Sequence, residues 1–267
     1  MIDALHYEFV QNALLAGLLV SIACGIIGSL IVVNRMVMLS GGVAHAAYGG
    51  IGLAIFCGLS PFLGAGLFSV AVALIMGILT LKNRERADTI IGVIWAVGMA
   101  IGIISIDLSP GYNVDLMSYL FGSILTVSHN DLWLMAGLDI IILGVIFLRY
   151  REFIAMSYDE EFAGLRGIPV RRLYFTLLVL SALTVVVTIQ VVGLILVIAL
   201  VTIPPYLAEQ YTRSLGQMMV VSTAFSALFT VVGLYLSYRF NLTSGATIIM
   251  VAAVVYGIVF GIGWLRR

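Results

Sequence analysis

Two ionisable side chains, His45 and Asp139, fall inside long apolar stretches of the sequence. Ionisable groups are costly inside a bilayer, so each is a candidate functional residue. Helical rise puts His45 about 13 Å from the cytoplasmic end of its stretch and Asp139 about 12 Å from the outer end of its own. At this shared depth an imidazole and a carboxylate would suit Zn²⁺, Mn²⁺ or Fe²⁺. Alternatively, His45 bonds a backbone carbonyl and Asp139 serves packing.

The composition predicts that these stretches lie in a membrane. Of the 267 residues, 62% are hydrophobic and 10% are charged, against roughly 45–50% and about 25% in a soluble domain. Mean hydropathy is +1.17. Lys and Arg number 13 and Asp and Glu number 13, so no excess of positive charge points to nucleic acid. A soluble globular enzyme is excluded, and a multi-pass protein of the cell (inner or plasma) membrane is predicted.

About 20 apolar residues cross a hydrocarbon core of ~30 Å. Nine such segments are predicted, at residues 9–33, 38–58, 62–81, 90–108, 131–149, 173–190, 191–211, 217–238 and 243–264. The stretch 173–211 has no polar break, so it is either two helices that reverse near Gly193 or one long tilted helix.

Basic residues favour the two-helix alternative, because cytoplasmic loops collect Lys and Arg. Nine spans with the N-terminus outside and the C-terminus inside leave only Arg239 on the outer side. Merging 173–211 into one span would instead move Arg213, Arg266 and Arg267 outside. Nine spans are therefore predicted, with eight as the alternative.

Two further segments are not simple spans. The apolar stretch 116–127 is too short to cross, and we expect it to be an interfacial or re-entrant helix on the outer side. The longest inner loop, 150–172, contains a short amphipathic pattern from Met156 to Leu165, closed by Gly167 and Pro169. A helix there suggests a docking surface for a soluble partner, or a helix lying on lipid headgroups. Residues 1–267 as a whole are predicted to be one transmembrane domain, with 150–172 as its cytoplasmic loop.

Motifs for catalysis are missing. The one lysine, Lys82, follows Leu81, so the sequence has no phosphate-binding GxxxxGK[ST] loop. The intramembrane protease motifs, a nucleophile with its base or paired aspartates, are also absent. The chain is therefore predicted not to be an enzyme, and any ATP hydrolysis would take place on a separate chain.

Four ordered stretches of the sequence match the motifs of a known family. They are Arg35 followed by Ala44-His45-Ala46-Ala47 and Gly50; Asp88-Thr-Ile-Ile-Gly92 with Gly98 and Gly102; Asp115 followed by Tyr119-Leu-Phe-Gly-Ser-Ile-Leu125; and Tyr158-Asp159, Ala163 and Gly167-Ile168, followed by Val192-Gly193 and Pro204. Across residues 9–260 the sequence resembles the permease subunits of bacterial ABC importers for zinc, manganese and iron(II).

This resemblance implies an all-α permease of the vitamin B12 and siderophore importer class. It would form a homodimer around an alternating-access pathway, together with cytoplasmic ATPases and an extracytoplasmic solute-binding protein. The inner loop would hold the coupling helix, with Asp159, Ala163, Gly164 and Gly167 coupling it to the ATPase. No cofactor is expected on this chain, only the transported divalent metal ion.

One departure from the family pattern concerns the metal. The family usually has Asp four residues before the histidine, and here that position is Gly41. His45 is then the matching metal candidate, and we predict Asp139 as a replacement ligand. The departure leaves room for a different substrate, such as an organic metal complex of the siderophore or vitamin kind. A separate alternative is an ion-coupled secondary transporter that needs no ATPase.

Overall fold

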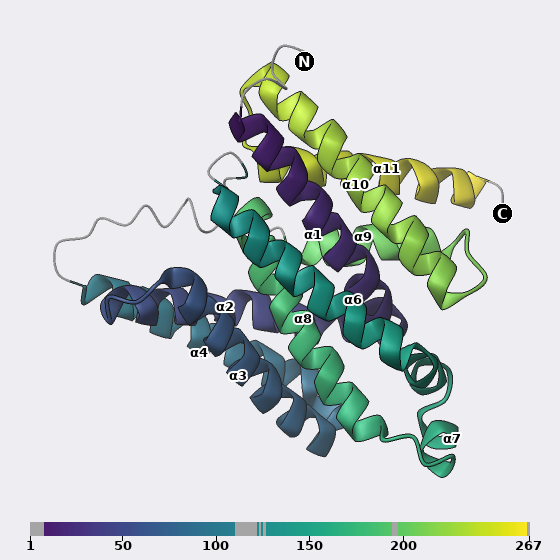
Figure 1. The fold of residues 1–267 in the computed structure, drawn as a ribbon. Helices are drawn as coiled ribbons and strands as arrows, with labels where there is room; N and C mark the ends of the chain where they lie inside the picture. The colour runs from purple at the N-terminus through teal and green to yellow at the C-terminus, as the bar shows by residue number, and fades with distance from the viewer. Residues whose placement is uncertain (1–7, 110–121, 123, 125–126, 194–196, 266–267) are drawn as a thin grey trace. The chain divides into compact units, whose positions relative to one another are not determined.

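The computed structural model describes residues 8–109, 122, 124, 127–193 and 197–265, and these residues form helices with no strand among them. In chain order the elements are α1 (Glu8–Val33), α2 (Val37–Phe56), α3 (Pro61–Lys82), the short 3₁₀ helix η2 (Arg84–Arg86), α4 (Ala87–Asp107), α6 (His129–Tyr158), α7 (Glu160–Leu165), α8 (Val170–Val192), α9 (Val197–Glu209), α10 (Leu215–Phe240) and α11 (Ser244–Leu265) (Figure 1). The predicted all-α class is confirmed for this part of the chain.

Within the described ranges, eight helices are long and apolar enough to cross a membrane. The exception among the nine predicted segments is 191–211, where α9 has only 13 residues, or about 20 Å of helix. The stretch 173–211 is nevertheless not one helix. It breaks after α8 at Gly193, whose φ of 85° is one that glycine adopts readily. The nine-span count and the orientation stay predictions, and most of 116–127 lies outside the described residues.

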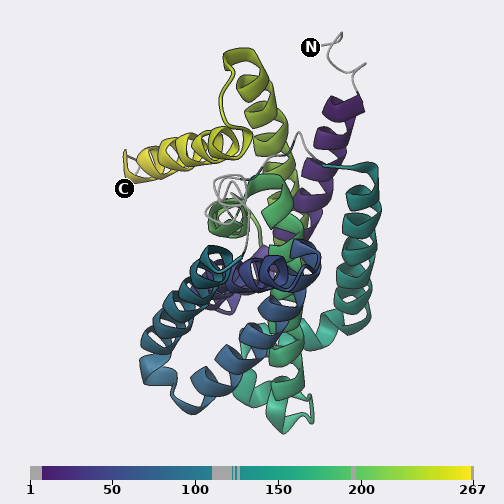
Figure 2. The same ribbon diagram turned by 90° about the vertical axis from the view of Figure 1, so that its left-hand side faces the viewer.

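The chain forms two compact units. The first unit comprises Met1–Val32, Met117–Gly144 and Val187–Arg267, and the second comprises Val33–Leu116 and Val145–Val186. In the first unit, α10 packs on α9 and α11, and Figure 2 shows these green-to-yellow helices together. Helix α1 joins them where Gly25 lies against the backbone of Thr223. Small residues allow such close approach in lipid, where packing rather than the hydrophobic effect holds helices together.

The second unit is built around α2, which packs on both α3 and α4. Its closest approach to α4 is at Gly52 and Gly102, where a methyl group on either glycine would meet backbone atoms of the other helix. Further along the same contact, Gly98 of α4 lies against Ala46. The helix that carries His45 is therefore positioned against α4 by residues without bulky side chains.

This packing predicts a stability difference between two glycines of α4. In Gly102→Ala the new Cβ would lie 2.6 Å from the carbonyl oxygen of Tyr48, so we expect a loss of about 1–3 kcal/mol. In the matched control Gly92→Ala the new Cβ would meet nothing within 4 Å. Thermal unfolding of the purified protein in detergent should separate the two variants. Equal midpoints would mean that this contact does not hold α2 in place.

The inner loop differs from its predicted form. Helix α6 has non-helical backbone angles at Arg149, φ −113° and ψ 18°, and then continues to Tyr158. The single helix expected at 156–165 is therefore split between the end of α6 and α7. The side chain of Asp159 accepts a hydrogen bond of 2.9 Å from the backbone N–H of Phe162 and starts α7 there.

Candidate functional site

His45 lies midway along α2 in the second unit. Its Nδ1 is 3.0 Å from the carbonyl oxygen of Gly41, one turn earlier in α2. A carbonyl oxygen only accepts, so Nδ1 carries the hydrogen and donates it. In the neutral ring this leaves the lone pair on Nε2, and no described residue hydrogen-bonds that atom. The bond to Gly41 is the backbone bond expected in the alternative in which His45 serves packing, and a metal-binding histidine is also held by such a bond.

Trp95 of α4 covers the His45 ring. The two ring centroids are 4.1 Å apart at an interplanar angle of 36°. The Trp95 indole is itself oriented, since its Nε1 donates to the sulfur of Met99 at 3.0 Å. The ring of His45 is therefore held on one face by Trp95 and at one edge by Gly41. Sequence analysis missed Trp95, because residues 50 positions apart give no local pattern that pairs them.

Asp139 lies on the part of α6 that belongs to the first unit. It is only 3% exposed, and neither carboxylate oxygen has a hydrogen-bond partner among the described residues. A buried carboxylate without a donor is costly, so it calls for a ligand, a proton or a functional reason. His45 belongs to the other unit, so the predicted pairing of these residues stays a prediction.

No group of three or more His, Cys, Asp and Glu side chains that could hold a metal occurs within the described ranges. Each candidate ligand is therefore at most part of a site. A transport site must release its ion, so a ligand set that is incomplete in one conformation is compatible with transport.

The predicted coupling residues take different places on α7 and after it. Asp159 caps the helix, and Ala163 is fully buried. Gly164 is exposed, and a Cβ added to it would meet nothing within 4 Å. Gly167 follows the helix with a φ of 79°, which ends it and turns the chain toward α8. Asp159 and Gly167 therefore set the ends of α7, and its exposed large apolar side chains are Phe162 and Leu165, 51% and 88% exposed.

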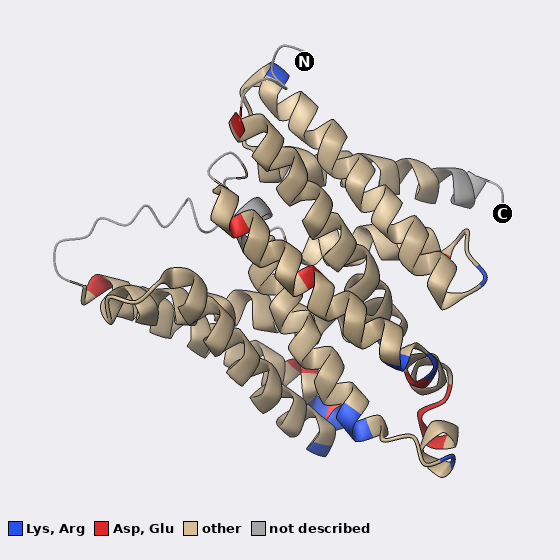
Figure 3. Ribbon diagram, in the orientation of Figure 1, with Lys and Arg blue, Asp and Glu red and all other residues tan. Residues whose placement is uncertain are grey.

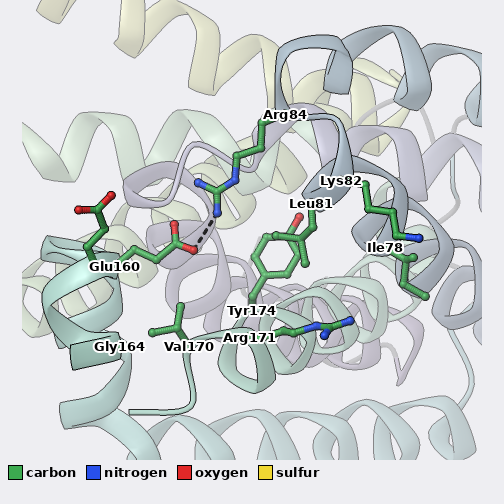
Figure 4. A pocket seen from close by; sticks show the side chains of 10 residues that line it. Ile78, Leu81, Lys82, Arg84, Glu160, Gly164, Val170, Arg171 and Tyr174 are labelled. Carbon is green, nitrogen blue, oxygen red and sulfur yellow. Dashed lines mark hydrogen bonds and ion pairs between the residues drawn. The ribbon is translucent and has the colours of Figure 1, made fainter. Parts of the chain in front are cut away.

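A pocket of 770 Å³ lies beside α7, where α3 ends and α8 begins. Its lining comes from α3, η2, α7 and α8 (Figure 4): Ile78, Leu81, Lys82, Arg84, Glu160, Glu161, Gly164, Val170, Arg171 and Tyr174. Arg84 and Glu160 form an ion pair of 2.8 Å across one side of it. The hydroxyls of Tyr174 and Thr80 are 3.2 Å apart and join α8 to α3. Sequence analysis did not predict this pocket.

The Lys and Arg residues of the second unit gather at the same end. Figure 3 shows its Lys and Arg around the end of α3, the start of α8, the end of α6 and α7. Such an accumulation is typical of a cytoplasmic membrane face.

Comparison with known proteins identifies the kind of transporter. Residues 6–262 match the model of the ABC 3 transport family. An uncharacterized membrane protein of Synechocystis sp. is 58% identical over 256 residues, which cover 96% of this chain and 91% of that protein. The manganese transport system membrane protein MntC of Listeria monocytogenes is 36% identical over 256 residues, with the same two coverages of 96% and 91%.

A solved structure agrees with these relatives. A chain of PsaBC from Streptococcus pneumoniae, determined in complex with Fab, matches with a TM-score of 0.88 and 34% identity, over 97% of this chain and 94% of that one. The resemblance predicted from the motifs is thus confirmed, as are a transport role in place of an enzymatic one and a location in the membrane. The chain is a multi-pass membrane protein that belongs to the ABC 3 transport family.

Proposed function

We propose that this chain is the permease subunit of an ATP-driven importer of a divalent transition metal ion, with Mn²⁺ as the first candidate. The observation that carries the proposal is the match to a manganese transport membrane protein over nearly the whole chain. The fold shared with a chain of PsaBC supports it further. An importer for a siderophore or vitamin complex, or a secondary transporter, has no comparable support.

His45 is the residue we propose as metal ligand on this pathway. Its Nδ1 is engaged by Gly41, so Nε2 is the atom that would bind the ion. A neutral imidazole suits Zn²⁺ and Fe²⁺, whereas Mn²⁺ favours oxygen ligands, so binding of Mn²⁺ would need a carboxylate or another oxygen ligand besides His45. Trp95 keeps the ring from rotating and so fixes the direction of that lone pair.

Asp139 is the carboxylate that we propose to act on the same ion. Asp139→Asn keeps the side chain's shape and removes its charge, so we expect Mn²⁺ uptake to fall about ten-fold. Thermal stability of the variant should be unchanged or higher, because the substitution removes a buried carboxylate that has no hydrogen-bond donor. Uptake assays and thermal unfolding on the same preparation test this. A stability loss with normal uptake would make Asp139 a structural residue.

ATP hydrolysis is assigned to partner chains. We propose that α7 is the coupling helix, that two copies of this chain enclose the pathway, and that an extracytoplasmic protein delivers the metal. Support comes from the Asp159-capped α7 at the end of the second unit where cations gather, the end expected to face the cytoplasm.

Reconstitution tests the whole proposal. The chain is placed in proteoliposomes with and without the ATPase and the solute-binding protein of its own organism. Uptake of Mn²⁺ is expected only with the full set of proteins and only with ATP. Uptake by the chain alone, driven by an ion gradient, would establish a secondary transporter instead.

A further inference from the structure

The pocket beside α7 lies where two apolar helices reach the end of their membrane-spanning segments. Helix α3 ends at Lys82, and α8 begins with Val170 and Arg171. Ile78 lies about one turn before the end of α3, and Tyr174 lies about one turn after the start of α8. Both are therefore on the apolar side of the charged residues. One part of the pocket wall is thus at the level of acyl chains and another at the level of headgroups.

Charge is unevenly distributed in this pocket. Of its three cations, Arg84 is paired with Glu160, and it is the only one that forms an ion pair with a described carboxylate. Figure 4 shows the Lys82 ammonium and the Arg171 guanidinium on one side of Tyr174, with Glu160 on the other. Lys82 and Arg171 therefore give one side of the pocket a net positive charge.

Both cations extend from apolar surroundings. The Arg171 guanidinium lies 6.0 Å from the ring centroid of Phe175, and Lys82 follows the apolar residues Ile78 and Leu81 of α3. Such side chains cover apolar surface with their stems and hold their charge at the membrane boundary. Ile78 is 44% exposed, so apolar surface continues from the pocket onto α3. A ligand with an anionic head and an apolar tail matches both parts.

We propose that this pocket binds the headgroup of an anionic phospholipid, with the phosphate between Lys82 and Arg171 and an acyl chain along Ile78. Basic pockets between membrane helices at the cytoplasmic side recognise anionic headgroups in this way. The hydrogen bond between Tyr174 and Thr80 holds α8 to α3 and keeps the pocket's apolar wall in place. The ion pair between Arg84 and Glu160 separates the bound phosphate from the acidic side of α7.

Native mass spectrometry of the intact importer, taken from nanodiscs with equal amounts of phosphatidylglycerol and phosphatidylcholine, tests the proposal. Phosphatidylglycerol should remain bound preferentially. Lys82→Gln and Arg171→Gln should each reduce its retention about five-fold, and Lys82→Arg should restore it. The matched control is Arg172→Gln, which removes a charge from the same turn of α8 but does not line the pocket.

Three results would overturn the proposal: equal retention of the two lipids, equal loss in the Arg171 and Arg172 variants, or retention that survives both pocket substitutions. Release of the lipid when the ATPase binds would also overturn it, because the pocket would then belong to the protein interface. All these outcomes are independent of which metal is transported.

Discussion

Replacing His45 with alanine is expected to reduce Mn²⁺ uptake by the reconstituted importer about 100-fold. Losing a ligand should cost at least as much as losing a group that orients one, which lowers metal affinity roughly 10- to 100-fold. Basal ATP hydrolysis and copurification of the ATPase should stay at the parent level. These readouts separate the loss of a ligand from the loss of the fold.

The matched control is His129→Ala. His129 is exposed at the start of α6, where its ring contacts Trp133, so its removal should leave uptake unchanged. A second variant, Trp95→Ala, removes the ring that covers His45 and keeps the ligand. It should reduce uptake less than His45→Ala does. Uptake at the parent rate in His45→Ala would show that this histidine only packs against Trp95 and that the metal follows a different route.

Hydropathy predicted the helices well and their ends less well. A window of apolar residues indicates a span, but it does not show where the backbone leaves the helix. In 173–211 the apolar pattern is continuous, so hydropathy alone allowed one long helix; the basic residues favoured a reversal near Gly193, and α8 does end there, at a glycine with positive φ. In the inner loop, the amphipathic pattern predicted a helix that starts at Met156. Helix α7 starts later, because the side chain of Asp159 caps it.

Contacts between residues on different helices could not be predicted from the sequence. No local pattern in the sequence shows that Gly102 of α4 meets Gly52 of α2. Which glycines meet depends on how the surfaces of α2 and α4 fit along their whole length. The same packing places Trp95 over the His45 ring. The Arg84–Glu160 pair joins residues 76 positions apart for the same reason. Local patterns single out His45 as the candidate residue, whereas tertiary packing supplies the residues that orient it.

The resemblance marked α7 as the coupling helix, and the structure shows which of its residues are available to a partner. Ala163 is buried, so a bulky charged residue there would disturb the second unit itself. Phe162 and Leu165 face outward, and the Arg166 guanidinium lies 4.9 Å from the Phe162 ring centroid. An exposed apolar pair on a short capped helix is typical of an anchor that fills a groove on a partner.

Leu165→Asp is therefore expected to detach the ATPase without unfolding the permease. Burying a charge in place of an apolar anchor should cost about 2 kcal/mol or more of binding free energy, or about 30-fold in affinity. Pull-down of the ATPase by the tagged permease measures this, together with thermal unfolding of the permease alone. Leu165→Met is the matched control, because it keeps an apolar side chain, and it should bind normally. Ala163→Arg should instead lower the unfolding temperature. If Leu165→Asp still retains the ATPase at parent stoichiometry, this face of α7 does not dock it, since the substitution leaves the buried side of the helix unchanged.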